Sequence, residues 1–200
     1  MLDARTNDRG NKMTDAGKPT FGRYAEIPVN QMTEAQQAAY HHLREHRGGL
    51  PGPYKLWVQN PGLAMAASPL GAHFTPGASS LSEREREIAV LVITAAWRSA
   101  YPTQAHERRG KEVGLPGDAV EAIIGGRPAT FTDRREQLVY EVATALADRR
   151  LVPQGLYDRA VDGLGHASIT DLIVLMGYYT CVSLTMSFYA VPPGSTGMPR

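Results

Sequence analysis

The amino-acid sequence predicts an all-α protein with a single domain of several helices. Apolar residues recur at three- and four-residue spacing between clusters of glycine and proline, and no segment alternates apolar and polar residues as a half-buried strand does. No internal repeat is present. With 200 residues, 42% of them hydrophobic, the chain can bury a sizeable core. We expect one domain over 21–192, a disordered N-terminal arm over 1–20 and a flexible C-terminal tail over 193–200.

Local signals place helices in the first third of the chain. A capping box that begins at Thr33 predicts a helix that continues to about His46. Asn60 is a typical N-cap for a second helix over 61–74. Pro69 lies inside this helix and lacks an amide hydrogen, so it predicts a kink or a break there.

The middle of the chain carries the strongest helix signal. A capping box at Ser82 is followed by apolar residues at helical spacing, which predicts an amphipathic helix to about Trp97. Pro102 suits the first turn of another helix, which should end at Gly114. Shorter or surface helices are expected over 118–124 and 133–148, and from residue 153.

A last helix, capped by Ser168 with Asp171, is apolar on nearly all sides from Ile169 to Phe188. Its length would just span a bilayer. Its several hydroxyl groups and the lack of a basic flank favour a buried central helix over a membrane span. In that setting the thiol of Cys181 should be buried and inert.

The composition excludes several classes of function. Lys and Arg total 21 and Asp and Glu total 20, so the net charge of +1 lacks the basic excess typical of nucleic-acid-binding proteins. The single cysteine allows no intrachain disulfide, no dithiol redox pair and no thiolate zinc cluster. Because residues 1–20 also contain no apolar segment typical of a signal peptide, we expect a reducing, cytoplasmic location.

Histidines and their carboxylate neighbours are the candidates for chemistry. His106 lies in the first two turns of its helix, where the helix dipole favours a neutral ring, as a base requires. If this helix packs as a hairpin on the preceding one, Glu87 can face His106 and hold one tautomer. The alternative is a core histidine with an unrelated solvated glutamate.

Other histidines give weaker signals. His42 and His46 share one helix face, but no third ligand is evident, so a solvated polar face is favoured over a metal site. His73 follows the expected kink and can line a pocket or lie at the surface. We therefore predict no metal and no cofactor.

The stretch from Ser80 to Ile124 contains the runs Ser-Leu-Ser-Glu-Arg-Glu-Arg-Glu-Ile-Ala and Ala-Tyr-Pro-Thr-Gln-Ala-His-Glu, and residues 175–180 read Leu-Met-Gly-Tyr-Tyr-Thr. This pattern resembles the carboxymuconolactone decarboxylase and alkylhydroperoxidase D-like family. In weaker form the resemblance covers 23–192. It implies the all-α fold of that family and a homotrimer or a dimer of trimers.

In the peroxidase branch of that family, a glutamate is followed by two cysteines three apart and by a histidine four residues later. Glu87 and His106 match the glutamate and the histidine, whereas Ser99 and Pro102 occupy the two cysteine positions. Neither residue can form a disulfide, so thiol peroxidase activity is not expected. The cysteine-free branch usually reads Tyr-Glu-Trp-x-x-His; here Tyr101 and His106 are present, but Pro102 replaces the glutamate.

The resemblance implies catalytic roles for His106, Glu87 and Tyr101. The candidate substrate-binding residues are His73, Trp57, Ser99 and Arg109. The leading hypothesis is an enzyme without a cofactor that decarboxylates, isomerises or opens a small carbonyl or lactone-type organic acid by histidine acid–base chemistry. The alternative is a non-catalytic member that binds a ligand or serves as a scaffold. Neither nucleic acid nor membrane is an expected partner.

Overall fold

The computed structural model describes residues 17–148 and 151–198. In these segments the regular structure is helical, apart from one isolated bridge between Phe21 and Tyr24, so the predicted all-α class is confirmed. Most of the predicted N-terminal arm, residues 1–16, lies outside the described residues. In the predicted tail, the backbone amide of Met198 donates a hydrogen bond to the buried carboxylate of Glu26.

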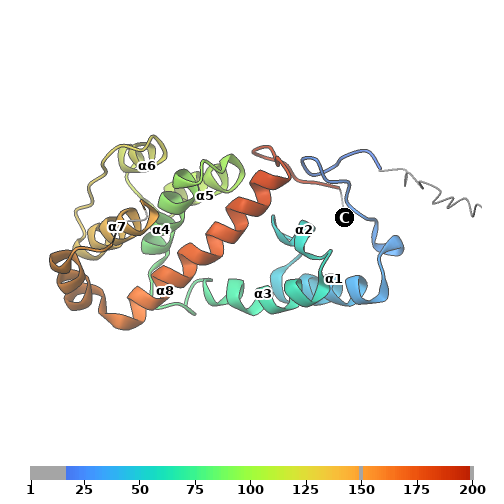
Figure 1. Cartoon of the computed structure of the whole chain (residues 1–200), viewed down its shortest axis with the longest axis horizontal. Helices are drawn as coiled ribbons and strands as arrows, with labels where there is room; N and C mark the ends of the chain where they lie inside the picture. Colours follow the sequence, from blue (N-terminus) through green and yellow to red (C-terminus); the bar gives the residue numbers. More distant parts are fainter. Residues whose placement is uncertain (1–16, 149–150, 199–200) are drawn as a thin grey trace, which may run out of the picture.

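The helices form two regions at opposite ends of an elongated molecule (Figure 1). The first region, here called the N-terminal layer, contains η1 (Val29–Gln31), α1 (Glu34–Arg47), α2 (Tyr54–Trp57) and α3 (Pro61–His73). The second region, here called the bundle, contains α4 (Glu83–Ala96), α5 (Ala100–Glu112), α6 (Gly117–Ile124), α7 (Arg134–Ala147) and α8 (Gln154–Phe188). The C-terminal half of α8 crosses from the bundle to the N-terminal layer (Figure 1).

The predicted caps of α1, α3 and α4 are present. The hydroxyl groups of Thr33 and Ser82 and the side-chain oxygen of Asn60 each accept a backbone hydrogen bond from the first turn that follows. Pro69 does not break α3, which continues to His73. Because Pro69 lies in the last turns of α3 on an exposed side, its ring removes one backbone hydrogen bond without disturbing a packed face.

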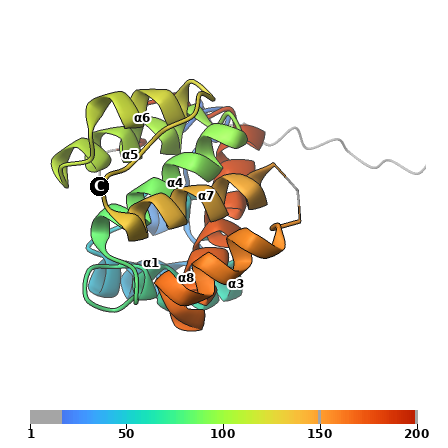
Figure 2. The same ribbon diagram turned by 90° about the vertical axis from the view of Figure 1, so that its left-hand side faces the viewer.

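Helix α4 is the centre of the bundle. Residues Glu85–Thr94 are buried without interruption, because α5, α6, α7 and α8 all pack around α4. Figure 2 shows α4 between α5 and α6 on one side and α7 and α8 on the other. The expected amphipathic helix is thus an enclosed one, and charged Glu85 is tolerated because Arg135 Nε lies 2.8 Å from its carboxylate.

The last helix differs from its prediction in where it begins. Two helices were expected with Ser168 as a cap, but α8 is helical on both sides of Gly165, whose φ of 75° and ψ of 161° break the helix there. Ser168 is buried and accepts a hydrogen bond from Arg135 at 3.3 Å. Asp171 binds side chains of the α3–α4 connection instead of capping a helix.

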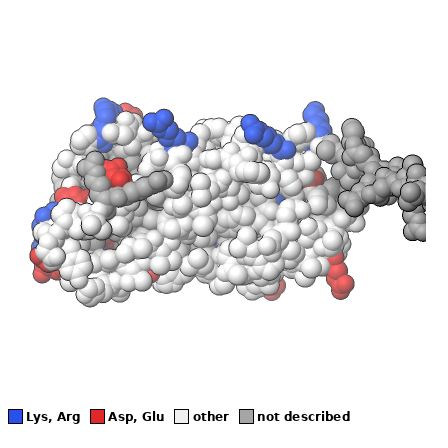
Figure 3. Space-filling view, in the orientation of Figure 1, with Lys and Arg blue, Asp and Glu red and all other residues white. Residues whose placement is uncertain are grey.

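Only one side of α8 is buried, so the predicted central position belongs to α4. Leu172, Leu175 and Met186 face the interior, whereas Leu184 and Phe188 are 49% and 75% exposed. Cys181 lies on the exposed side, which corrects the prediction of a buried thiol. Charged side chains lie mainly near the margins of the face shown in Figure 3, and its middle, over α8 and α3, is almost free of them.

Helix α8 is long and apolar enough to cross a membrane by length and composition alone. In the described part of the chain, no other helix meets these criteria. Its inner side packs on α4 and α7, as in the core helix of a soluble protein, which passes the same test. The apolar length of α8 and its packing do not decide between the two cases, so the expectation that the protein has no membrane partner stays a prediction.

Candidate active site

The hairpin of α4 and α5 brings Glu87 and His106 together, as the helix spacing allowed. The Nδ1 atom of His106 lies 2.6 Å from Oε2 of Glu87, and Glu87 is only 2% exposed. An ionised carboxylate can only accept, so Nδ1 carries the proton that is donated to Glu87. The other ring nitrogen, Nε2, has no hydrogen-bond partner among the described residues and is left as the basic atom.

A guanidinium group completes the surroundings of Glu87. The Nη2 atom of Arg86 lies 3.4 Å from Oε1 of Glu87, and the Arg86 side chain is buried beside it. A carboxylate enclosed in protein needs such compensation, because removal from water disfavours its charge. Glu87 therefore has one oxygen directed to His106 and the other to Arg86.

A cavity of about 410 Å³ opens at this pair, where the bundle meets the N-terminal layer. The bundle contributes charged and aromatic side chains: Arg86, Glu87, Tyr101, His106, Tyr178 and Tyr179. The N-terminal layer and the loop after α1 contribute Arg47, Gly52, Tyr54, Gly71 and Phe74. Aromatic walls with a few convergent polar groups are typical of small-molecule sites.

The tyrosines around His106 are neutral hydrogen-bond donors. The ring of Tyr179 stands edge-on to that of His106, with centroids 4.8 Å apart. Burial raises the pKa of Tyr179, and the negative charge of Glu87 raises it further. Burial also raises the pKa of Tyr101 and of Tyr178. These phenol groups therefore keep their protons at neutral pH.

Four of the seven predicted site residues line this cavity: Glu87, Tyr101, His106 and Arg109. Arg109 is held at its rim by Glu83, whose carboxylate lies 2.6 Å from Nη2. Pro102 also lines the cavity, at the position where the resembled family has its glutamate.

The other three predicted residues lie elsewhere. The indole of Trp57 turns toward α8, where Nε1 donates to Thr185 at 3.0 Å. His73 is at the outer end of α3 and binds Asp171 at 2.9 Å. Ser99 is buried in the α4–α5 turn, with its hydroxyl 3.4 Å from a backbone carbonyl of α8. Each is fixed by a tertiary contact that the sequence did not reveal.

Several residues of the cavity were given no role by the sequence analysis, among them Arg47, Tyr54 and Arg86. Arg47 is the last residue of α1, where basic side chains are common in any helix, so it gave no specific signal. Tyr54 belongs to a segment in which the sequence indicated only apolar character. Arg86 directly precedes Glu87, and this proximity was the one available signal.

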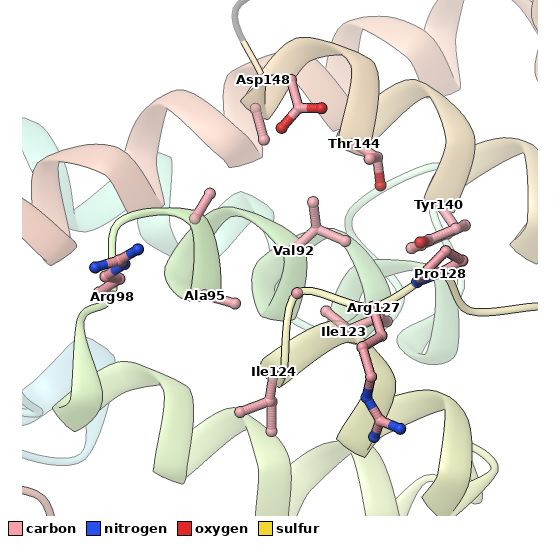
Figure 4. Close-up of a pocket in the computed structure, with 14 residues that line it drawn as sticks. Val92, Ala95, Arg98, Ile123, Ile124, Arg127, Pro128, Tyr140, Thr144 and Asp148 are labelled. Atoms are coloured by element: carbon pink, nitrogen blue, oxygen red, sulfur yellow. The ribbon is translucent and has the colours of Figure 1, made fainter.

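A second cavity, of about 420 Å³, lies between α4, α6 and α7 (Figure 4). Its wall combines apolar Val92 and Ile123 with Arg98, Arg127 and Asp148 at its edges, and it contains no histidine. Elsewhere, too, the described residues contain no group of three or more His, Cys, Asp or Glu side chains that could hold a metal ion. The carboxylate–histidine pair therefore makes the first cavity the candidate active site.

The fold and this pair define an all-α protein with a buried carboxylate–histidine site. No family model matches the sequence, and no curated protein matches it significantly. The structure is similar to an uncharacterized peroxidase-related protein from Silicibacter sp. TM1040, with 19% identity and a TM-score of 0.68 over 92% of this chain and 96% of the other. A second similar structure, described as an alkylhydroperoxidase AhpD core, is a peroxidase-related protein from Ralstonia eutropha JMP134, with 13% identity and a TM-score of 0.70 over 88% and 94%.

The debrominase Bmp8 is also similar, with 12% identity and a TM-score of 0.59 over 81% of this chain and 87% of that chain. At these identities the similarity establishes the fold. The chain therefore has the alkylhydroperoxidase D-like fold, as the sequence resemblance implied.

Proposed function

We propose that the protein is an enzyme in which His106 transfers a proton to and from a small carbonyl or lactone-type organic acid. The observation that carries this proposal is the 2.6 Å hydrogen bond between Glu87 and His106 Nδ1, which leaves Nε2 unpartnered on a side chain that lines a cavity. A positioned base of this kind contributes about 10²- to 10⁴-fold to rate.

The chemistry follows from the tautomer. Nε2 accepts a proton from the carbon beside a carbonyl group. The carbon–hydrogen electron pair forms a carbon–carbon double bond, and the π pair of the carbonyl group moves to its oxygen, which gives an enolate. The buried carboxylate of Glu87 stabilises the imidazolium that results, and Arg86 and the tyrosine hydroxyls provide donors for the enolate oxygen. Return of the proton to a different carbon is isomerisation. If the enolate instead forms by loss of CO₂ from a β-keto acid, proton delivery completes decarboxylation.

The similar structures support an enzyme over a passive binding protein, since one is a debrominase and others are described as peroxidase-related. Thiol chemistry is not part of the proposal, because Cys181 is the only cysteine and it lies on the exposed side of α8. The alternative is a ligand-binding or scaffold protein, favoured by Pro102 at the position of the usual glutamate, because proline has no acidic group.

The test compares His106→Ala with a matched control, His41→Ala, whose side chain is exposed on α1. A thermal-shift screen of small aromatic and dicarboxylic acids identifies compounds that bind. Solvent deuterium incorporation and CO₂ release then report turnover of those compounds. We expect His106→Ala to lose about 10²- to 10⁴-fold in rate and His41→Ala to lose none. A fully active His106→Ala would contradict the proposal and favour the binding or scaffold alternative.

We also propose a homo-oligomer, with a trimer expected from the family resemblance. Its support is the exposed apolar face formed by Ile173, Val174, Leu184 and Phe188 of α8 with Leu63 and Leu70 of α3. Such faces commonly mark protein interfaces. Light scattering should show an assembly at micromolar concentration, and Leu184→Glu should dissociate it. A wild-type monomer at that concentration would contradict this proposal.

A further inference from the structure

The three arginines of the site cavity differ in how their charge is compensated. Arg109 pairs with Glu83 at 2.6 Å, and Arg86 contacts Glu87 at 3.4 Å. Arg47 has no carboxylate within ion-pair distance among the described residues. Its guanidinium lies over the ring of Tyr54, 5.6 Å from the centroid. The cavity therefore has one positive charge that no carboxylate in the described part of the chain balances.

Polar groups from three helices converge next to this charge. A side-chain carbon at Gly71 would lie 2.8 Å from each hydroxyl of Tyr54 and Tyr178, and 3.3 Å from Nη2 of Arg47. The glycine thus allows polar atoms of α1, α2 and α8 to approach one another closely, because any side chain at this position would collide with the two hydroxyls. Tyr54 donates to the carbonyl of Ala67 at 2.9 Å, so the proton of the 3.2 Å contact between the two hydroxyls comes from Tyr178. The donors that remain for a ligand here are those of Arg47.

Arg86 presents further donors to the same cavity. Its residue is 7% exposed, yet its one hydrogen bond to another described residue is the 3.4 Å contact with Glu87. A guanidinium has five N–H donors, and no nitrogen atom of Arg86 is among the fully buried atoms that lack a partner, so its remaining donors open to the cavity. A ligand rich in acceptor oxygens would satisfy the remaining donors.

We infer that the cavity binds a small monocarboxylate, whose carboxylate group is held by Arg47 and whose carbonyl or lactone oxygen faces Arg86 beside His106. This inference rests on the proposed function, because it names the substrate class of the same site. The planar guanidinium fork suits a carboxylate. One uncompensated positive charge matches a monoanion better than a phosphate dianion. The rings of Tyr54, Tyr101 and Tyr179 suit a planar, unsaturated body between the two polar ends.

The direct test is binding, measured by calorimetry and thermal shift without turnover. The probes are benzoate and levulinate, each compared with a neutral analogue of similar shape, benzamide and methyl levulinate. We expect the carboxylates to bind more tightly than the neutral analogues. Arg47→Met should weaken carboxylate binding by about 10- to 100-fold, the effect of losing a hydrogen bond to a charged group. The control is Arg108→Met, since Arg108 is exposed on α5 and pairs only with Glu112.

Two further variants guard against misfolding as an explanation. Gly71→Ala keeps every charge but places a methyl group 2.8 Å from the two hydroxyls, so the polar groups around Arg47 must shift and carboxylate binding should also weaken. Arg86→Lys keeps the charge but loses the fork, so it should weaken levulinate, which has a carbonyl oxygen, more than benzoate. Circular dichroism and melting temperature establish that each variant is folded.

The outcomes separate this inference from the proposed function. Equal binding of the neutral analogues, unchanged affinity in Arg47→Met, or no binding of either carboxylate would overturn the carboxylate site. His106→Ala should bind benzoate normally, since it leaves the arginines in place. Arginine-dependent binding without any proton transfer would overturn the proposed enzyme and leave the carboxylate site intact. Turnover of neutral carbonyl compounds with a KM independent of Arg47 would overturn the carboxylate site and leave the proposed enzyme intact.

Discussion

The bundle and the N-terminal layer support the two ends of one cavity in different ways. The acid–base pair of Glu87 and His106 lies on α4 and α5, and α4 is enclosed by four other helices. Arg47 and Tyr54 lie on the N-terminal layer, which has its own smaller cluster of buried residues. Trp57 of α2 docks this layer on α8 through a hydrogen bond to Thr185. The groups proposed to move protons are thus held by the larger core, and Arg47, which is proposed to hold the ligand's carboxylate, by the smaller one.

This comparison has a general lesson for reading such a site. A reacting pair must keep its geometry within a few tenths of an ångström, and burial inside a bundle provides that. A region that recognises the rest of a ligand can differ in sequence without a change in the geometry of the reacting pair. Three predictions examine how independent the two regions are.

The largest expected effect is on stability. Leu91 on α4 and Leu43 on α1 are both fully buried, each in the core of its own region. Leu91→Ala should lower the free energy of unfolding by about 3–5 kcal/mol, because the enclosed site cannot collapse around the cavity that is created. Leu43→Ala should cost about 2–3 kcal/mol, since the smaller core can relax. Urea denaturation measures both. An equal or larger loss for Leu43→Ala would contradict the difference between the two cores.

The second largest effect is expected on the turnover rate, kcat, because both residues of the acid–base pair lie in the bundle. Glu87→Gln keeps an acceptor for His106 Nδ1 but removes the negative charge that stabilises the imidazolium, so turnover should fall by about 10- to 100-fold. Benzoate binding should change little, because Arg47 is untouched. Steady-state kinetics should show the loss in kcat with a nearly constant KM. A variant with raised KM and normal kcat would assign Glu87 to binding instead.

The smallest effect concerns the connection between the regions. Asp171 of α8 accepts hydrogen bonds from His73 and from Ser79 and Ser80, which follow α3. Burial alone would raise the pKa of this carboxyl, but these hydrogen bonds together hold it well below its usual value. Asp171→Asn should therefore cost about 1–2 kcal/mol at neutral pH.

The pH dependence gives the sign of this effect. A carboxyl with a lowered pKa stabilises the folded state above its unfolded pKa of about 4 and loses that contribution as the pH falls toward the folded value. The stability difference between the wild type and Asp171→Asn should be constant from about pH 6 to 8 and shrink below about pH 4. Thermal unfolding at several pH values measures it. A difference that grew in acid would contradict the role given to Asp171.

Local signals in the sequence were sufficient for most helices and for the acid–base pair. Caps such as Thr33 and Ser82 act within one turn, so the sequence alone locates them. The contact of Glu87 with His106 needed only one hairpin between neighbouring helices. The roles of Glu87 and His106 in turnover remain predictions.

Features that depend on distant packing were not predictable in this way. The apolar pattern of 169–188 could not reveal that only one side would be covered, and Cys181 was placed inside for that reason. Arg47 and Tyr178 are far apart in the sequence and meet only because the N-terminal layer docks on α8. The start of the last helix was predicted at Ser168, whereas the break lies at Gly165, because the serine side chain is used in a tertiary contact with Arg135.

Gly165 sets the direction of the C-terminal part of α8, which carries Tyr179 to the cavity, and is here called the pivot. Its backbone conformation, φ 75° and ψ 161°, is accessible almost only to glycine. From this pivot to Tyr179 the helix extends about 20 Å, at about 1.5 Å per residue. A rotation of about 10° at the pivot would therefore displace the Tyr179 ring by about 3–4 Å, comparable to its spacing from His106. The position of an aromatic wall of the cavity thus depends on two backbone angles at a residue that does not line the cavity, together with the packing of α8 on α4.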